Sequence, residues 1–301
     1  MCLRNICHQN KRTFLMRLFT LIVFMSLVIF NNILIAQDNE EQKQHEDFNA
    51  SNFDETSINV TNRWFPLKPW TRHVYEGTSV DEGEKFAHRV VITVTDFTKV
   101  IDGVNCVVSW DLDYSEGELV EAELAFFAQD KEGNVWRMGE YPVEYEEGKV
   151  IDAPGWIHGT EESIAGIEMY ANPTVEMPSY SQGWAPSVDF TDRAMVDKTG
   201  IKNCVPLDCY EDVIVIAELS LSEPDAQQLK YFAPGVGNIR VGWRGEGEMT
   251  QEVLELVEIQ NVVLGAVDEA RKEAMELEKY AFENSEDVYG KTSPMVQRTL
   301  D

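Results

Sequence analysis

A close succession of turns and strands in the first half of the chain limits the fold more than any other feature. Asp102-Gly103 separates two runs rich in valine, isoleucine and threonine, and both residues accept the positive φ angles of a type I′ hairpin turn. Further turns follow at short intervals, at 115–118, 130–134 and 146–149. Even spacing of short strands is typical of an all-β barrel or sandwich. The sequence therefore predicts an antiparallel meander that forms a barrel or half-barrel.

The second half of the chain departs in two places from this regular alternation of strands and turns. Residues 153–186 are rich in glycine and proline, carry several large aromatic side chains and show no sustained period. This composition opposes regular strand pairing, but so much apolar surface requires burial or a ligand. We therefore expect a long irregular excursion that covers an open face of the sheet. Strands resume after it, and residues 266–283 contain no Gly or Pro, which predicts a C-terminal helix.

The N-terminus is built like a secretory signal. Basic residues precede an apolar run at 18–30, and Ala36 offers a cleavage site. The polar, acidic residues that follow predict a disordered linker. The expected organisation is a signal peptide or N-terminal anchor at 1–36, the linker at 37–62, a β domain at 63–262, and a helix with its tail at 263–301. The protein should therefore be exported to the periplasm or the extracellular space.

The formal net charge of −28 argues against nucleic acids and anionic membrane surfaces as partners. Nucleic acids and acidic lipid head groups bind proteins through Lys and Arg, and the only basic-rich region here is the extreme N-terminus. We expect no nucleic-acid partner, and we expect membrane contact only through an uncleaved N-terminal segment. The acidic remainder favours solubility or contact with cations.

Two cysteines of the predicted β domain lie close together. Cys204 and Cys209 enclose Val-Pro-Leu-Asp, and a four-residue hairpin loop would oppose them directly, near disulfide distance. Export permits such a bridge, and two reduced thiols on a turn are the alternative. Cys106 has no such neighbour in sequence. A zinc site is disfavoured because no second Cys or His pair stands nearby.

Catalytic signatures are absent from the sequence. It contains no Gly-x-Ser-x-Gly elbow, no His-Glu-x-x-His helix and no glycine-rich phosphate or dinucleotide loop. His158 is the histidine around which dispersed carboxylates could form a hydrolase site. Asp111 and Asp113 share one face of a strand, with Glu121 and Glu123 expected opposite, so calcium is the one cofactor the sequence suggests. A solvated acidic sheet face is the simpler interpretation.

The aromatic residues suggest binding of a hydrophobic small molecule or lipid. Aromatic side chains on successive strands of a barrel line either its core or a pocket. Those on the predicted strands are Trp110, Phe126, Phe127, Trp136, Tyr141 and Tyr145. Together with the aromatic residues of the excursion, they lead us to expect ligand-binding residues at Trp136, Trp156, Tyr170 and Trp184.

Several stretches resemble a family of exported bacterial proteins of unknown function, lipoproteins among them. These stretches lie between Phe65 and Ile259 and read FPLKPWTRHVYEG, VTDFTKVIDGVNCVV, GELVEAELAFFAQDKEGNVWRMGEY, VPLDCYEDVIVI and YFAPGVGNIRV. The resemblance implies a β-rich secreted domain and supplies no catalytic residues. This sequence departs from the family at the Cys204–Cys209 pair, at Trp70, where glycine is usual, and in its helical tail. The strand pattern is also similar in architecture to half-barrel domains that carry lipids across the periplasm.

Three functions remain open from the sequence. The first is an exported, non-enzymatic β-domain that acts as an envelope accessory protein or binds a hydrophobic ligand. The second is a hydrolase with His158 and dispersed carboxylates. The third is a calcium-stabilised surface protein.

Overall fold

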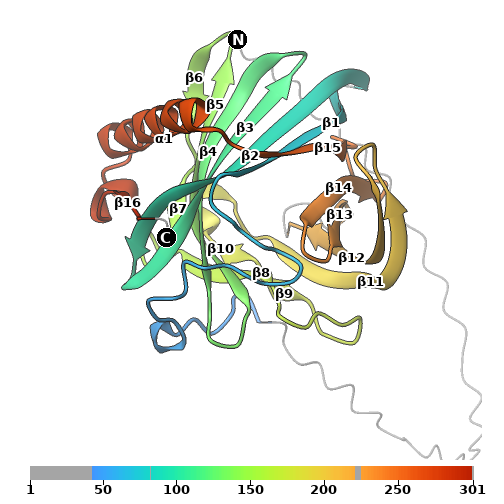
Figure 1. Ribbon diagram of the computed structural model, residues 1–301, viewed down its shortest axis with the longest axis horizontal. Coiled ribbons are helices and arrows are strands. Elements are labelled where there is room, and N and C mark those ends of the chain that lie inside the picture. The colour runs from blue at the N-terminus through green and yellow to red at the C-terminus, as the bar shows by residue number, and fades with distance from the viewer. Residues whose placement is uncertain (1–42, 82, 221–224, 300–301) are drawn as a thin grey trace, which may run out of the picture. The chain divides into compact units, whose positions relative to one another are not determined.

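The described part of the chain folds as one antiparallel sheet that curls into a nearly closed barrel (Figure 1). This structure is a computed structural model, and it describes residues 43–81, 83–220 and 225–299. The predicted all-β barrel with an irregular excursion and a C-terminal helix is confirmed. The predicted signal segment at 1–36 and the first residues of the predicted linker lie outside the described residues.

Two meanders of long strands supply most of the wall. The first comprises β1 (Thr71–Asp81), β2 (Glu84–Ile101), β3 (Val104–Ser115), β4 (Glu118–Gln129) and β5 (Val135–Glu146). The second comprises β11 (Arg193–Cys204), β12 (Cys209–Leu219), β13 (Gln227–Ala233), β14 (Gly237–Arg244) and β15 (Val253–Asn261). Short strands lie between or after them: β6 (Lys149–Asp152), β7 (Trp156–Ile157), β8 (Ile164–Met169), β9 (Tyr180–Ser181), β10 (Gly183–Trp184) and β16 (Val296–Gln297). The strand order is β10-β8-β5-β4-β3-β2-β1-β15-β14-β13-β12-β11-β9.

The excursion closes the barrel instead of covering it. β9 pairs with β11 at one end of the strand order, and β10 pairs with β8 at the other. Because β9 and β10 are separated by Gln182 alone, one short segment joins both ends of the sheet. We call residues 180–184 the seam. Glycine is required here by close approach, because a Cβ at Gly166 of β8 would lie 2.2 Å from the carbonyl carbon of Gln182.

The two ends of the barrel interior differ in composition. Near the turn between β4 and β5, aromatic rings fill the space: Phe65 lies 5.2 Å from Phe127 and 6.3 Å from Phe232 between ring centroids. Near the turns that join β1 to β2 and β3 to β4, the inward side chains are mostly charged. The first end is a hydrophobic core, and the second end is the polar region described below.

Residues 43–62 correct one sequence-based expectation. They fall in the segment predicted to be disordered, yet Phe53 and Val60 are buried in the main core. Phe48 packs with its ring centroid 5.7 Å from that of Trp136, and Arg193 donates a 2.6 Å hydrogen bond to the Lys43 carbonyl. Average composition predicts disorder because apolar residues are few. Each of these few has an apolar partner on the barrel, which is enough to order the segment.

Helix α1 (Leu264–Asn284) packs on the outer side of the barrel (Figure 1). Ala274, Leu277 and Ala281 are buried in the main core, whereas Met275 is exposed. Two 3₁₀ turns, η1 (Ala50–Asn52) and η2 (Pro186–Val188), precede the helix and a third, η3 (Tyr289–Lys291), follows it. None of the helices in the described ranges is both long and apolar enough to cross a membrane.

Candidate functional site

A groove lies on the outer face of the barrel, between strands β1–β4 and helix α1. Its floor follows from strand register. Val74 pairs with Val91, and Val91 pairs with Leu112, so these three apolar side chains form one row on the same face. Trp110 and Tyr114 lie in the rows on either side. The floor of the groove is therefore apolar along its centre.

The roof of the groove is the N-terminal half of α1. Ala266 and Ala270 line it, and their small side chains leave a cavity of about 840 Å³ between helix and sheet. The C-terminal half of the helix packs closely on the main core, and in the N-terminal half Arg271 bonds to Asp96 of β2 at 2.6 Å, so the open space lies beside Ala266 and Ala270. The volume lies within the range of about 300–1,000 Å³ that is usual for small-molecule sites.

Charged side chains stand at the edges of the groove. Arg72 donates from Nε to Thr93 Oγ1 at 3.0 Å and makes no ion pair with any described residue. Across the floor, Arg89 lies 3.7 Å from Glu76, and both side chains are more than half exposed. The groove thus combines an apolar centre with one guanidinium that lacks a carboxylate partner within the described ranges.

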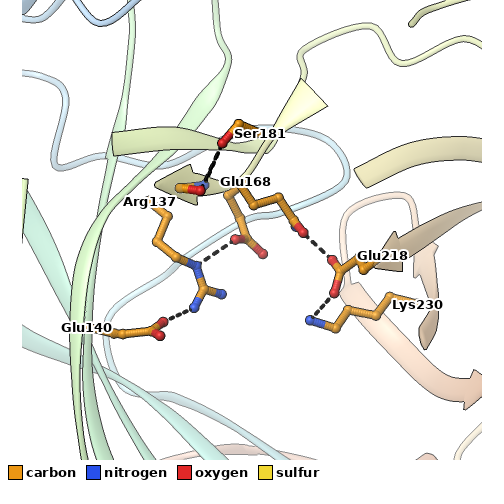
Figure 2. Close-up of polar contacts among 8 residues, drawn as sticks. Arg137, Glu140, Glu168, Ser181, Glu218 and Lys230 are labelled. Atoms are coloured by element: carbon orange, nitrogen blue, oxygen red, sulfur yellow. Dashed lines mark hydrogen bonds and ion pairs between the residues drawn. The ribbon is translucent and has the colours of Figure 1, made fainter. Parts of the chain in front are cut away.

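Inside the barrel, charged side chains from distant strands meet (Figure 2). Arg137 of β5 contacts Glu140 of the same strand, and its Nε lies 3.0 Å from Glu168 Oε2 of β8. Burial opposes the charge on Arg137, but Glu168 and Glu140 outweigh it and raise the pKa of the guanidinium. This cation ties β8 to β5 beside the seam.

A second ion pair faces the first from β12 and β13. Lys230 Nζ lies 2.6 Å from Glu218 Oε2, and Gln182 of the seam donates to Glu218 Oε1 at 2.7 Å (Figure 2). Burial alone would lower the pKa of Lys230, but Glu218 and Glu168 raise it. Ser181 Oγ also bonds to the Gly183 carbonyl at 2.9 Å. These contacts therefore hold the seam by one side-chain hydrogen bond to β12 and by one within the seam itself.

Strands β3 and β4 add carboxylates without cations of their own. Asp111 pairs with Glu123 and Asp113 with Glu121, which is the register the sequence led us to expect. We call these four residues the acidic wall. Burial is the main reason that the pKa values of Asp111 and Glu121 rise to about 7 and that of Glu123 rises well above its usual range. All four face inward yet are partly accessible, so this part of the interior holds open space.

The acidic wall carries the predicted calcium ligands, Asp111 and Asp113. Within residues 43–81, 83–220 and 225–299, no group of three or more His, Cys, Asp or Glu side chains is arranged to hold a metal ion. The geometry adds no support for calcium at these positions, and that site stays a prediction.

His88, which the sequence did not single out, links the acidic wall to the start of β15. Its Nε2 lies 2.6 Å from Asp113 Oδ1, and its Nδ1 lies 3.0 Å from Glu252 Oε1. Burial acts to lower the pKa of His88, but hydrogen bonds to the two carboxylates raise it to about 10. A charged imidazole on β2 therefore connects Asp113 of the acidic wall to Glu252.

The four aromatic residues predicted to bind a ligand lie away from the groove. Trp136 and Trp156 are buried, and Tyr170 and Trp184 are partly buried. Trp136 donates from Nε1 to Asp130 Oδ2 at 2.9 Å. None of the four lines the groove, so their role in binding stays a prediction. Trp110, in contrast, is the one predicted strand aromatic that lines it.

His158 follows β7 in the sequence and lies beside the turn between β2 and β3. Its Nε2 is 3.4 Å from Asp102 Oδ2, and its Nδ1 accepts a 3.0 Å hydrogen bond from the Ala165 amide. Burial lowers the pKa of His158 although Asp102 opposes this. The carboxylates of Figure 2 are engaged with Arg137 and Lys230, and a hydrolase site at His158 stays a prediction.

The predicted disulfide between Cys204 and Cys209 is confirmed. The two residues are directly opposed at the end of the β11–β12 pair, with Cα atoms 4.0 Å apart. Cys106 is a buried free thiol. The bridge closes a hairpin and lies outside both the groove and the charged interior.

The strands that form the groove carry a signal in the sequence. Along β2, inward and outward positions are both apolar or buried, as Val90 and Val91 illustrate. A strand that is apolar on both faces requires cover on both faces. An amphipathic helix downstream is a natural cover for the outer one, and it places the groove near Val74, Val91 and Leu112.

Comparisons with known proteins give two structural neighbours of low similarity. No protein-family model and no curated protein matches the chain. A protein from Bacteroides fragilis, provisionally described as exported and with a YmcC-like fold, shares 11% identity over 66% of this chain and 99% of its own, with a TM-score of 0.39. A provisionally described lipoprotein from Parabacteroides distasonis shares 12% identity over 65% and 97%, with a TM-score of 0.34.

Both neighbours are described as an exported protein or a lipoprotein, which is the class that the sequence motifs resemble. At TM-scores this low, the likeness carries no argument about ligand or activity. Membership of this chain in the family stays a prediction.

Proposed function

We propose that the protein is an exported, non-enzymatic binding protein for an amphipathic small molecule with an acyl-like chain and an anionic head group. The observation that carries this proposal is the cavity of about 840 Å³ under α1 with its apolar floor. The ligand is the hydrophobic one expected from the sequence, but its site is the groove and not the excursion.

The chain of the ligand would lie on the row formed by Val74, Val91 and Leu112. Each methylene group buried there contributes about 0.8 kcal/mol, so a long alkyl chain binds tightly without any polar contact. Ala266 and Ala270 in the roof favour the same occupant, because larger side chains would fill the space themselves.

The head group would lie against Arg72. This guanidinium uses Nε for Thr93 and has further N–H donors directed to no described carboxylate. Arg and a carboxylate or phosphate form paired, charge-assisted hydrogen bonds. Arg72 thus favours an anionic head group beside it, although Glu269 and Glu273 of α1 also line the groove.

Binding of a fluorescent fatty acid to the purified protein, followed by displacement with hexadecanoate and hexadecanol, tests this function. We expect Ala266→Phe, which fills the groove, to weaken hexadecanoate binding at least about tenfold, equivalent to roughly 1.4 kcal/mol. Met275→Phe adds the same ring to the exposed side of the helix and should leave affinity unchanged.

Arg72→Gln should weaken binding of hexadecanoate but not of hexadecanol, with Arg89→Gln as the matched control. Equal affinity of Ala266→Phe and wild type would place the ligand elsewhere. Loss of binding in Trp184→Ala would then favour the excursion.

A further inference from the structure

Residues 43–48, which we call the strap, contact the seam from a distant part of the sequence. The backbone amide of Ser181, in β9, donates a 3.0 Å hydrogen bond to Glu46 Oε1. Ser181 is fully buried, whereas the strap is partly open to water. A buried backbone amide requires an acceptor, and here a side chain of the strap supplies one.

Arg193 of β11 holds the first residue of the strap. Its Nη1 donates to the Lys43 carbonyl at 2.6 Å, and its Nη2 donates to the Ser179 carbonyl at 2.8 Å. Arg193 is 3% exposed and makes no ion pair with any described residue, and burial lowers the pKa of its guanidinium. A buried cation that depends on carbonyl oxygens is destabilised when one of them leaves, so β11 and the strap stabilise each other.

Phe48 fixes the other end of the strap to the opposite side of the closure. Its ring centroid lies 4.0 Å from that of His158 and 5.7 Å from that of Trp136. Trp136 belongs to β5, whereas Arg193 belongs to β11, and the seam joins these two sides of the sheet. The strap therefore binds on both sides of the closure that the seam makes.

The closure itself rests on short strands. β9 and β11 share two residue pairs, and β10 and β8 share another two. Elements with so few backbone contacts open at a low free-energy cost unless other contacts hold them. The remaining charged side chains of the strap, Lys43 and Asp47, are 59% and 83% exposed and pair with each other, which adds little stability. The strap thus has the contacts to hold the seam and little else to keep it in place.

We propose that the strap is a latch that controls opening of the barrel at the seam. With the strap attached, Ser181 and Arg193 are held and the barrel is closed. When the strap detaches, the seam opens and water or a solute reaches the ion pairs of Arg137 and Lys230, which lie beside Gln182 (Figure 2). The latch is separate from the groove under α1, which no described strap residue lines.

Amide exchange of the full chain, followed by mass spectrometry, tests the latch. In the double variant Glu46→Ala with Phe48→Ala, exchange of residues 180–184 should accelerate at least about tenfold, because the seam then opens more often. Exchange in the centres of β3 and β4 should not change. Asp47→Ala, which alters an exposed side chain of the same strap, is the matched control and should change neither region. Unchanged exchange at the seam, or equal acceleration throughout the barrel, would overturn the proposal.

A peptide with the sequence of residues 43–53 separates a detachable latch from a fixed structural segment. Added to the double variant, it should slow exchange of the seam again, whereas the same peptide with alanine at positions 46 and 48 should not. No effect of either peptide, or an equal effect of both, would overturn the proposal. Hexadecanoate binding should be the same in the double variant and in the wild type, so the latch and the proposed function can fail separately.

Discussion

Charged side chains are buried on the same sheet both at Lys99 and in the acidic wall, but the two places differ in how completely the charges are paired. The Lys99 side chain is 0% exposed, and its Nζ lies 3.2 Å from Glu278 Oε1, 2.7 Å from the Ser293 carbonyl and 3.9 Å from the ring centroid of Tyr289. Every group there has a partner. The acidic wall is partly accessible and has more carboxylates than cations.

The difference separates a structural ion pair from a candidate binding site. The Lys99–Glu278 pair fixes α1 and the C-terminal tail to β2, and nothing further is needed to satisfy it. The acidic wall costs stability in the protein by itself, which is understandable if the cost is recovered when a cation or a proton binds. A water-accessible cluster with more carboxylates than cations, such as the acidic wall, is therefore a better guide to function than a fully paired ion pair such as Lys99–Glu278.

The largest expected effect on stability concerns the Lys99–Glu278 ion pair. Glu278→Ala removes the only carboxylate that contacts Lys99 in the described ranges and leaves this buried group with the Ser293 carbonyl and the Tyr289 ring, so the free energy of unfolding should fall by about 3–5 kcal/mol. Urea unfolding measures this loss. The double variant Lys99→Met with Glu278→Leu should recover most of it, because an apolar pair fills the same space. If the single variant loses no more than an exposed substitution such as Glu276→Ala, the pair is not structural.

The free energy of unfolding, measured over a range of pH, tests the acidic wall. The pKa values of Asp111 and Glu121 are raised to about 7 by burial, from about 4 in the unfolded chain. The folded state therefore binds protons more tightly, and the free energy of unfolding should rise by roughly 1–2 kcal/mol as the pH falls from about 8 to about 5. This stabilisation is lost as the pH rises through about 7. Stability that instead increases between pH 5 and 8 would contradict the assignment.

The smallest expected effect has the opposite sign to the first. Glu123→Gln removes one of two opposed carboxylates, and its amide can donate to Asp111, so stability at pH 8 should increase by about 0.5–1 kcal/mol. Urea unfolding of this variant is compared with that of Glu118→Gln, an exposed position on the same strand that should change little. A destabilised Glu123→Gln would show that the wall is held by contacts other than charge.

Local chemistry in the sequence predicts the first meander well. Asp102 and Gly103 adopt φ angles of 45° and 78°, as their turn requires, and the strands on either side follow from it. Gly77 shows the limit of such reasoning. A glycine after a short apolar run suggests the end of a strand, but β1 continues through Gly77 to Asp81. Glycine is needed at this position because a Cβ would lie 1.8 Å from the Val253 carbonyl oxygen of β15. The cause is a partner strand far away in sequence.

The candidate sites also divide into those that local sequence predicts and those that depend on segments far apart in the chain. Alternation along β3 and β4 is enough to place Asp111 and Asp113 opposite Glu123 and Glu121, since cross-strand pairs within one hairpin are local. The groove needs α1 to lie across β1–β4, and the excursion needs β8 and β11 to meet through the seam. Neither arrangement is encoded in any short stretch of the chain. The sequence could not place the aromatic residues of the excursion relative to the seam, and their role in ligand binding stays a prediction.

The seam also has a kinetic consequence. Each meander consists of neighbouring hairpins that can form early, whereas closure joins β8 to β10 and β11 to β9 through strands of two residues each. We expect closure to be the last step of folding and the first to reverse. An open barrel would expose the edges of β8 and β11, which could then pair with other chains. Faster amide exchange at Ser181 and Gly183 than in the centres of β3 and β4 would reveal this opening, and equal protection would argue against it.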